Sequence, residues 1–109
     1  MISVKIQSNV YGAVLFHSGE EYGSVCADGF DKNAAKVVCK EKSWNTAMSL
    51  CCSAFGPSNR AFTMSDVRCT GSESSVRKCE HTVGGSCHSG QYAAVVCASS
   101  EMGFTSKYV

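Results

Sequence analysis

Eight cysteines in a chain of 109 residues limit what this sequence can fold into more than any other feature. They stand at positions 26, 39, 51, 52, 69, 79, 87 and 97. No pair is spaced as Cys-x-x-Cys, so the signatures of zinc ribbons and of thioredoxin-like redox sites are missing. An even set at wide spacing in a short chain is typical of a disulfide framework formed in an oxidising compartment. A cytosolic protein with reduced thiols is the alternative, and spacing alone leaves about 105 connectivities open.

The length and the charge of the chain exclude several classes of protein. A chain of 109 residues corresponds to one domain, whose core alone is only marginally stable. Its 10 basic and 9 acidic residues give a net charge of +1, which argues against a nucleic-acid partner. No stretch approaches the roughly 18 apolar residues of a membrane span. Residues 1–9 lack the apolar core of a signal peptide. We therefore expect a small, neutral globular domain, not a multidomain enzyme or a membrane-spanning chain.

One helix is predicted, over about residues 31–42. Asp31 is suited to an N-cap, and Phe30 and Ala35 are placed for the hydrophobic contact that often fixes a helix start. The apolar residues that follow share one side, while the lysines lie largely elsewhere. Ala35 and Cys39 are four residues apart, so the cysteine is expected to face inward with the alanine.

Short strands are predicted on both sides of this helix. Apolar and polar residues alternate over 2–7, which indicates a strand with one solvated face. A polar turn at 17–21 separates two apolar runs and indicates a hairpin. Residues 43–60 are expected to be irregular, because Gly-Pro interrupts them. The expected strands are 2–7, 13–16, 22–26, 61–67 and 92–97, with one or two helical turns in 72–79 and a tail at 99–109.

The order of motifs along the chain resembles that of one known family. Residues 12–41 read GAVLFHSGEEYGSVCADGFDKNAAKVVCKE, residues 54–81 read AFGPSNRAFTMSDVRCTGSESSVRKCEH, and residues 87–97 read CHSGQYAAVVC. They resemble the opening, the middle and the closing segment of a scavenger receptor cysteine-rich domain. The resemblance covers about residues 2–98 and implies one domain over 1–98 with a tail at 99–109. The implied fold class is α+β, a small disulfide-stapled domain whose curved antiparallel sheet cradles one main helix, with long loops.

The resemblance also implies which cysteines are paired. The six-cysteine pattern of the family, group A, corresponds here to the bonds Cys26–Cys87, Cys39–Cys97 and Cys69–Cys79. The eight-cysteine pattern adds a bond between two positions that are Val10 and Trp44 in this chain. The chain is therefore similar to group A, and Trp44 is expected to fill space in the core where that bond would lie.

Cys51 and Cys52 are left over by this pattern. A disulfide between adjacent residues is the simplest pairing, although Cα atoms only about 3.8 Å apart strain it. Two free thiols, or bonds to a second chain that create a homodimer, are the alternatives. No histidine lies near these cysteines in the sequence, so a catalytic thiol is not expected.

Many members of the family hold a divalent cation, but most of the corresponding ligand positions differ here. At the first family site, the carboxylate positions correspond to Ala27, Asp28 and Gln91. At the second site they correspond to Ser65 and Asp66. One carboxylate in each site is too few for tight calcium binding. We therefore predict no cofactor and no metal, with Asp28 and Asp66 as the residual calcium candidates and turn or capping residues as the alternative.

Basic residues are the candidate ligand-binding residues. Arg68, Arg77 and Lys78 are expected to form a small patch, with Arg60 nearby. Basic clusters in similar scavenger receptors attract polyanions such as bacterial surface polymers. An ordinary solvated face is the alternative reading of four charges in a near-neutral domain.

The resemblance implies an extracellular, non-catalytic recognition module. Protein or polyanionic ligands, microbial surfaces among them, are expected to bind loops around 45–60 and 80–92. The sequence shows no Ser/His/Asp arrangement, phosphate loop or metal motif, so no catalytic residue is predicted. Two alternatives remain: an accessory domain of a larger extracellular enzyme or receptor, and a secreted protein that dimerises through Cys51 or Cys52.

Overall fold

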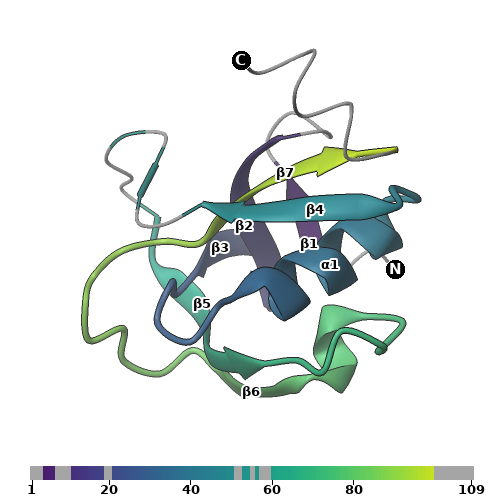
Figure 1. Ribbon diagram of the computed structural model, residues 1–109. Helices are drawn as coiled ribbons and strands as arrows, with labels where there is room; N and C mark the ends of the chain where they lie inside the picture. Colours follow the sequence, from purple (N-terminus) through teal and green to yellow (C-terminus); the bar gives the residue numbers. More distant parts are fainter. Residues whose placement is uncertain are drawn as a thin grey trace.

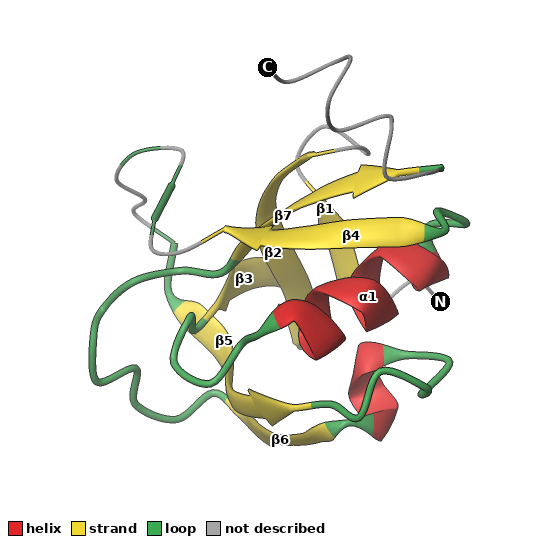
Figure 2. Ribbon diagram, viewed as in Figure 1, coloured by secondary structure: helices red, strands yellow, loops and turns green. Residues whose placement is uncertain are grey.

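The fold is given by a computed structural model, which describes residues 4–6, 11–18, 21–50, 53–54, 56 and 60–99 (Figure 1). In the described part of the chain, a single α-helix lies beside strand β4 (Figure 2). A short 3-10 helix packs on another side of that α-helix. The elements in chain order are β1 (Val4–Ile6), β2 (Tyr11–Ser18), β3 (Glu21–Val25), α1 (Lys32–Glu41), β4 (Thr46–Leu50), β5 (Phe62–Arg68), η1 (Val76–Lys78), β6 (Glu80–Val83) and β7 (Ala94–Ala98).

The strands form one curved sheet in the order β4-β7-β2-β3-β5-β6, and β1 also pairs with β2. All the pairings are antiparallel except that of β3 with β5. Ala93 lies where β2 and β3 separate. Its carbonyl accepts a hydrogen bond from the Val14 N–H at 3.0 Å, and its own N–H donates to the Val25 carbonyl at 2.7 Å. Through these two hydrogen bonds Ala93 links the backbone of β2 to that of β3.

Helix α1 has nearly the bounds that its local sequence predicts. The Asp31 carboxylate accepts a hydrogen bond from the Ala34 N–H at 3.1 Å, which satisfies one of the free amides at a helix start. Lys40 lies in the last turn, where the helix dipole favours a cation. The apolar side packs mainly on β4 and β7. Its buried residues are Ala34, Ala35, Val37, Val38 and Cys39.

Among the described residues there are three disulfides, two of which join segments 61 and 58 residues apart in the sequence. They are Cys26–Cys87, Cys39–Cys97 and Cys69–Cys79, the same pairings that the resemblance implies. Cys39 lies on the buried side of α1 and Cys97 lies in β7, so their bond ties the helix to the sheet. Cys51 and Cys52 lie outside the described residues, as do Val10 and the tail beyond Ser99.

Two strands lie where the sequence predicts none. β4 falls inside 43–60, so the expectation of an irregular segment there is wrong for its five residues. Strand β4 pairs along its whole length with β7, which begins 44 residues after β4 ends; no local pattern reveals such a pairing. β6 is an edge strand whose residues are mostly exposed, so it shows no apolar alternation.

The remaining expected elements are found, with shifted ends. The five predicted strands correspond to β1, β2, β3, β5 and β7, and η1 is a single turn within 72–79. Trp44 is half-buried and packs against the main core, as expected for a residue that fills space there. Among the described residues, no helix is both long and apolar enough to cross a membrane.

Candidate functional site

The Cys69–Cys79 disulfide brings two basic residues together. Arg68 is the last residue of β5 and Lys78 the last residue of η1, and each directly precedes one of the bonded cysteines. The two cysteine Cα atoms are 4.8 Å apart, so the Cα atoms of Arg68 and Lys78 lie no more than about 12 Å apart. Both side chains are exposed. The disulfide thus fixes the backbone from which two cations project.

Arg77 is the third cation at this place. Its guanidinium carbon lies 5.5 Å from the centre of the Phe16 ring, within the range of a cation–π interaction. Phe16 is only 2% exposed and belongs to the main core. The Ser75 hydroxyl accepts a hydrogen bond from the Arg77 N–H at 3.2 Å and holds the start of η1. We call Arg68, Arg77 and Lys78 the basic cluster.

Arg60 does not belong to the basic cluster. It lies two residues before β5, whereas Arg68 is the last residue of that strand. Seven residues of extended chain span about 20 Å, so the two arginines lie at opposite ends of β5. One guanidinium nitrogen of Arg60 donates a hydrogen bond to the Tyr22 carbonyl at 3.2 Å. The structure therefore places three of the four candidate residues together and one apart.

Acidic residues lie close to the basic cluster without pairing with it. Glu80 is the cross-strand partner of Arg68 in the β5–β6 register. Asp66 lies at the irregularity of β5, with a φ of 54° that Asp tolerates better than most residues. In the part of the chain that the structure describes, no ion pair joins these carboxylates to Arg68, Arg77 or Lys78. The three cations therefore remain open to a ligand.

Glu73 holds the loop between Cys69 and η1. Its carboxylate accepts hydrogen bonds from the N–H groups of Thr70 and Gly71 at 3.0 to 3.1 Å. These bonds, with that of Thr70 contributing most, keep the pKa of Glu73 below its ordinary value of 4.5. The ionised carboxylate thus stabilises the backbone of this loop.

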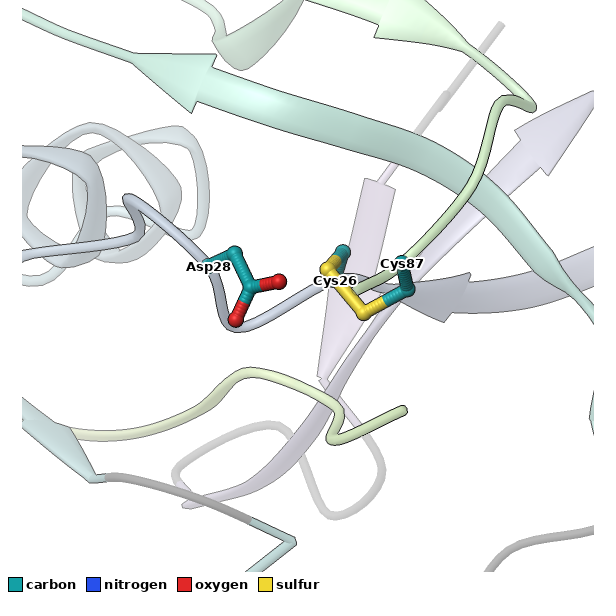
Figure 3. A group of neighbouring side chains, drawn as sticks. All are labelled: Cys26, Asp28 and Cys87. Atoms are coloured by element: carbon teal, nitrogen blue, oxygen red, sulfur yellow. A yellow bond between two sulfur atoms is a disulfide. The ribbon is translucent and has the colours of Figure 1, made fainter. Parts of the chain in front are cut away.

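Asp28 lies beside the Cys26–Cys87 disulfide, in the turn after β3 (Figure 3). Its carboxylate accepts a hydrogen bond from the Ser89 N–H at 3.0 Å. Hydrogen bonds from the Ser89 side chain and backbone, with a smaller effect of the His88 charge, lower the pKa of Asp28 below its ordinary value of 3.8. Asp28 therefore links the turn after β3 to the loop that leads into β7.

The described carboxylates fit a calcium ion poorly. Two groups of three potential ligand side chains occur among the described residues: Cys26, Asp28 and Cys87, and Cys69, Glu73 and Cys79. In each group the two sulfurs are bonded to one another and are not thiolates, so a single carboxylate remains. Calcium takes about six to eight oxygen ligands. Asp66 belongs to neither group, and the expectation of no metal, with Asp28 and Asp66 as residual candidates, stays a prediction.

The two predicted binding loops meet at Tyr92. Its hydroxyl donates to the Gly56 carbonyl at 2.6 Å, and its N–H donates to the Ser53 hydroxyl at 3.2 Å. Parts of the ranges 45–60 and 80–92 are the strands β4 and β6, so only their remaining residues are loops. Residues 51–52, 55 and 57–59 lie outside the described part of the chain.

Sequence reasoning missed one hollow beside α1. It has a volume of about 130 Å³ and is lined by Lys36, Lys40, Trp44, Asn45 and Gly71. The signal was present, because Lys36, Lys40 and Trp44 follow one another at intervals of four residues. From the sequence alone, the lysines lie largely away from the apolar side of the helix, and no site is predicted there.

The arrangement of one helix, a curved sheet and three disulfides has known relatives. Residues 4–98 match the scavenger receptor cysteine-rich domain. The chain belongs to this family. Scavenger receptor cysteine-rich (SRCR) domains are non-catalytic modules, and the structure agrees with the expected fold class.

Curated relatives of this SRCR domain are much longer than the chain. A scavenger receptor cysteine-rich domain superfamily protein of Patiria pectinifera is 33% identical over 89 residues, which cover 79% of this chain and 8% of the relative. Lysyl oxidase homolog 3A of Danio rerio is 33% identical over 85% of this chain and 13% of its own length. Macrophage scavenger receptor types I and II of Mus musculus is 32% identical over 78% of this chain and 19% of its own length. The chain thus spans less than a fifth of each of these relatives.

Solved SRCR structures share the fold. The dimeric form of the SRCR domain of mouse MARCO superposes with a TM-score of 0.72 at 27% identity, covering 81% of this chain and 86% of that one. The third SRCR domain of murine neurotrypsin superposes with a TM-score of 0.74 at 23% identity, covering 86% of this chain and 94% of that one. The likeness to the neurotrypsin domain concerns the fold alone.

Proposed function

We propose that this SRCR domain is an extracellular recognition module that binds polyanionic ligands through the basic cluster. The observation that carries the proposal is the rigid placement of three exposed cations by one disulfide and by the Phe16 ring. Because the backbone at Arg68 and Lys78 and the guanidinium group of Arg77 are already held, less conformational freedom is lost when a ligand binds. The three disulfides support an oxidising, extracellular location.

The chemistry of the basic cluster favours an anion that carries many acidic groups. A guanidinium group presents a planar fork of donors that matches sulfate, phosphate and carboxylate oxygens, and a lysine adds a point charge. The nearby acids Asp66 and Glu80 leave only a small excess of positive charge. We therefore expect weak binding at one domain and strong binding to a repeating polyanion.

The relatives support a place within a larger extracellular protein. The module accounts for 8 to 19% of the three relatives described above, so each contains much more than one such domain. In our proposal this domain supplies recognition, and any catalysis belongs to other parts of the full protein. Sequencing the complete transcript tests this placement, and a reading frame that encodes this domain alone would contradict it.

Binding to immobilised dextran sulfate tests the role of the basic cluster. We expect the triple variant R68A/R77A/K78A to bind at least about tenfold more weakly than the unaltered domain. Arg60→Ala is the matched control, since it removes one cation at the far end of β5, and it is expected to change the affinity by less than about twofold. Salt should weaken the interaction. Equal losses in the triple variant and in Arg60→Ala would overturn the assignment.

Self-association is a second candidate, favoured by an exposed apolar row on the sheet. Tyr11 and Met48 are each 42% exposed and flank Val96 in the β2–β7–β4 register. The SRCR domain of mouse MARCO has a dimeric form. We expect Met48→Lys to shift sedimentation velocity profiles toward the monomer, whereas Val83→Lys, at an apolar residue 59% exposed on β6, leaves them unchanged. A wild-type domain that is monomeric at all concentrations would exclude this candidate.

A covalent dimer through Cys51 or Cys52 remains a separate proposal from the sequence. Both cysteines lie outside the described residues. A non-reducing intact mass tests it directly, because a doubled mass that disappears on reduction is expected for such a dimer. A single-chain mass before and after reduction would exclude it.

A further inference from the structure

The hollow beside α1 is built from two segments that are distant in the sequence. One wall is the second half of the helix and the residues after it, and the other is Gly71 in the loop after β5. Gly71 has a φ of 102°, and a Cβ atom there would lie 3.2 Å from the side-chain oxygen of Asn33 on the helix. The loop backbone therefore approaches α1 closely, and glycine both permits the conformation and leaves the space open.

Two lysines give the hollow its charge. Lys36 and Lys40 are one helical turn apart, so their side chains share a face, and both are exposed. Like charges at this spacing repel and lower the stability of a helix. No acidic residue lines the hollow, and in the described segments neither lysine forms an ion pair. Glu73, in the loop that provides Gly71, has its carboxylate on the backbone N–H groups of Thr70 and Gly71. An anion placed between the lysines would relieve their repulsion.

Trp44 belongs to the first wall, and the turn at the end of the helix fixes its backbone. The chain reverses at Ser43, whose φ is 68°, and the Trp44 N–H then donates to the Cys39 carbonyl at 3.0 Å. The indole packs against the main core with part of its surface still exposed. A fixed aromatic face beside two ammonium groups suits a ligand that has both an apolar face and an acidic group.

The size of the hollow limits the ligand to one small unit. Its volume of about 130 Å³ is well below the roughly 300 to 1,000 Å³ of pockets that enclose a drug-sized molecule. A sugar ring has one face of C–H groups, which an aromatic π-face attracts because the face of the ring system is negative. A sulfate ester on that sugar would meet the ammonium groups, and the Asn45 amide offers a further donor to its hydroxyl groups.

We infer that this hollow binds a single sulfated sugar unit, with the ring on Trp44 and the sulfate between Lys36 and Lys40. The site lies on α1, whereas the basic cluster lies on β5 and η1, so the two are separate and use different residues. The inference goes beyond the proposed function, because it assigns a second surface to a ligand of defined size and chemistry.

The chain carries its own reporter for this site. Trp44 is the single tryptophan, so tryptophan emission, excited selectively over that of the tyrosines, reports on the surroundings of this one residue. Titration of the full chain with N-acetylglucosamine 6-sulfate is expected to change the emission saturably at millimolar concentration, as is usual for a small ligand at one shallow site. N-acetylglucosamine, which lacks the sulfate, and inorganic sulfate, which lacks the ring, are each expected to bind at least about tenfold more weakly.

Matched variants separate this site from the basic cluster. K36A/K40A should weaken the binding of the sulfated sugar at least about tenfold, and alanine keeps the helix intact. The control K32A/K42A removes the same charge at lysines that do not line the hollow and should change the affinity by less than about twofold. R68A/R77A/K78A should leave this titration unchanged even if it abolishes binding to dextran sulfate. The Gly71 amide resonance, followed by NMR, provides a second readout that does not depend on the indole.

Three results would overturn the inference. The first is no saturable change in emission or in the Gly71 resonance at concentrations well above millimolar. The second is equal affinity for inorganic sulfate or for the neutral sugar, which would remove the sulfated sugar as the ligand. The third is an equal loss of affinity in K36A/K40A and K32A/K42A, which would show that the effect comes from net charge alone. Failure of dextran sulfate binding at the basic cluster leaves each of these measurements interpretable.

Discussion

The three disulfides allow the contributions of loop length and burial to be measured separately. Cys26–Cys87 and Cys39–Cys97 overlap in sequence, with separations of 61 and 58 residues. While one of them is intact, the other closes a loop of only about 23 residues, because the shortest path runs through the intact bond. Loop-closure entropy then gives each bond about 3.4 kcal/mol, and gives Cys69–Cys79, with a separation of 10, about 2.7 kcal/mol.

Burial distinguishes the bonds in a second way. Both sulfur-bearing residues of Cys39–Cys97 are 1% exposed, whereas Cys26–Cys87 and Cys69–Cys79 each combine one buried and one half-buried cysteine. Removing the first pair also leaves a cavity between α1 and β7, which adds about 1 kcal/mol. The bond removed in C26A/C87A closes a loop of the same length as the bond removed in C39A/C97A but is less buried. It is as buried as the bond removed in C69A/C79A but closes a longer loop.

Urea unfolding of the three double-alanine variants under non-reducing conditions gives the test. We expect the free energy of unfolding to fall most in C39A/C97A, by about 3.4 kcal/mol in C26A/C87A, and by about 2.7 kcal/mol in C69A/C79A. The midpoint temperatures should fall in the same order. If C69A/C79A loses as much stability as C39A/C97A, the reasoning from loop length and burial is wrong.

Three further predictions concern single residues. Asp31→Ala removes the N-cap of α1 and should lower the free energy of unfolding by about 0.5–2 kcal/mol, measured by urea unfolding; no change would mean that the cap contributes nothing. The pKa values of Asp28 and Glu73 are lowered by folding, so their stabilisation is present above the unfolded-state pKa and lost as the pH falls through the lower folded-state pKa. The melting temperature of the unaltered domain should therefore fall below about pH 4, and it should fall less steeply in D28N/E73Q. Identical pH profiles of the two proteins would refute this. Gly23→Ala places a Cβ atom 2.5 Å from the Ala61 carbonyl oxygen and against Thr63. The variant should melt at a much lower temperature than Gly90→Ala, where that atom meets nothing and only the φ of 70° strains the alanine.

Local signals in the sequence predicted the elements that depend on local interactions. Helix α1 was found because Asp31 caps it and its apolar residues share one side. Strand β4 was missed because its formation depends on pairing with β7 far along the chain, which no local pattern contains. The three disulfides came from the family resemblance, since spacing alone cannot choose among the possible pairings.

The candidate site was predicted in part for the same reason. Arg68 and Lys78 each precede a cysteine of one bond, so the pairing implied by the resemblance already brings them together. Arg60 was expected nearby because it is close in sequence, but an extended strand separates residues that a helix would keep close. The hollow at Lys36, Lys40 and Trp44 needed the position of Gly71, which only the tertiary structure supplies.

The contact between Arg77 and Phe16 means that an outward-facing cation rests on an interior side chain. Phe16 therefore has two effects, since it packs in the core and also supports the direction in which the cation points. In the proposed binding mode, replacing the ring by an aliphatic side chain would alter ligand binding although no exposed side chain is changed. Inherited or engineered changes that retune what this surface attracts can thus arise at a position that a map of the exterior would never include.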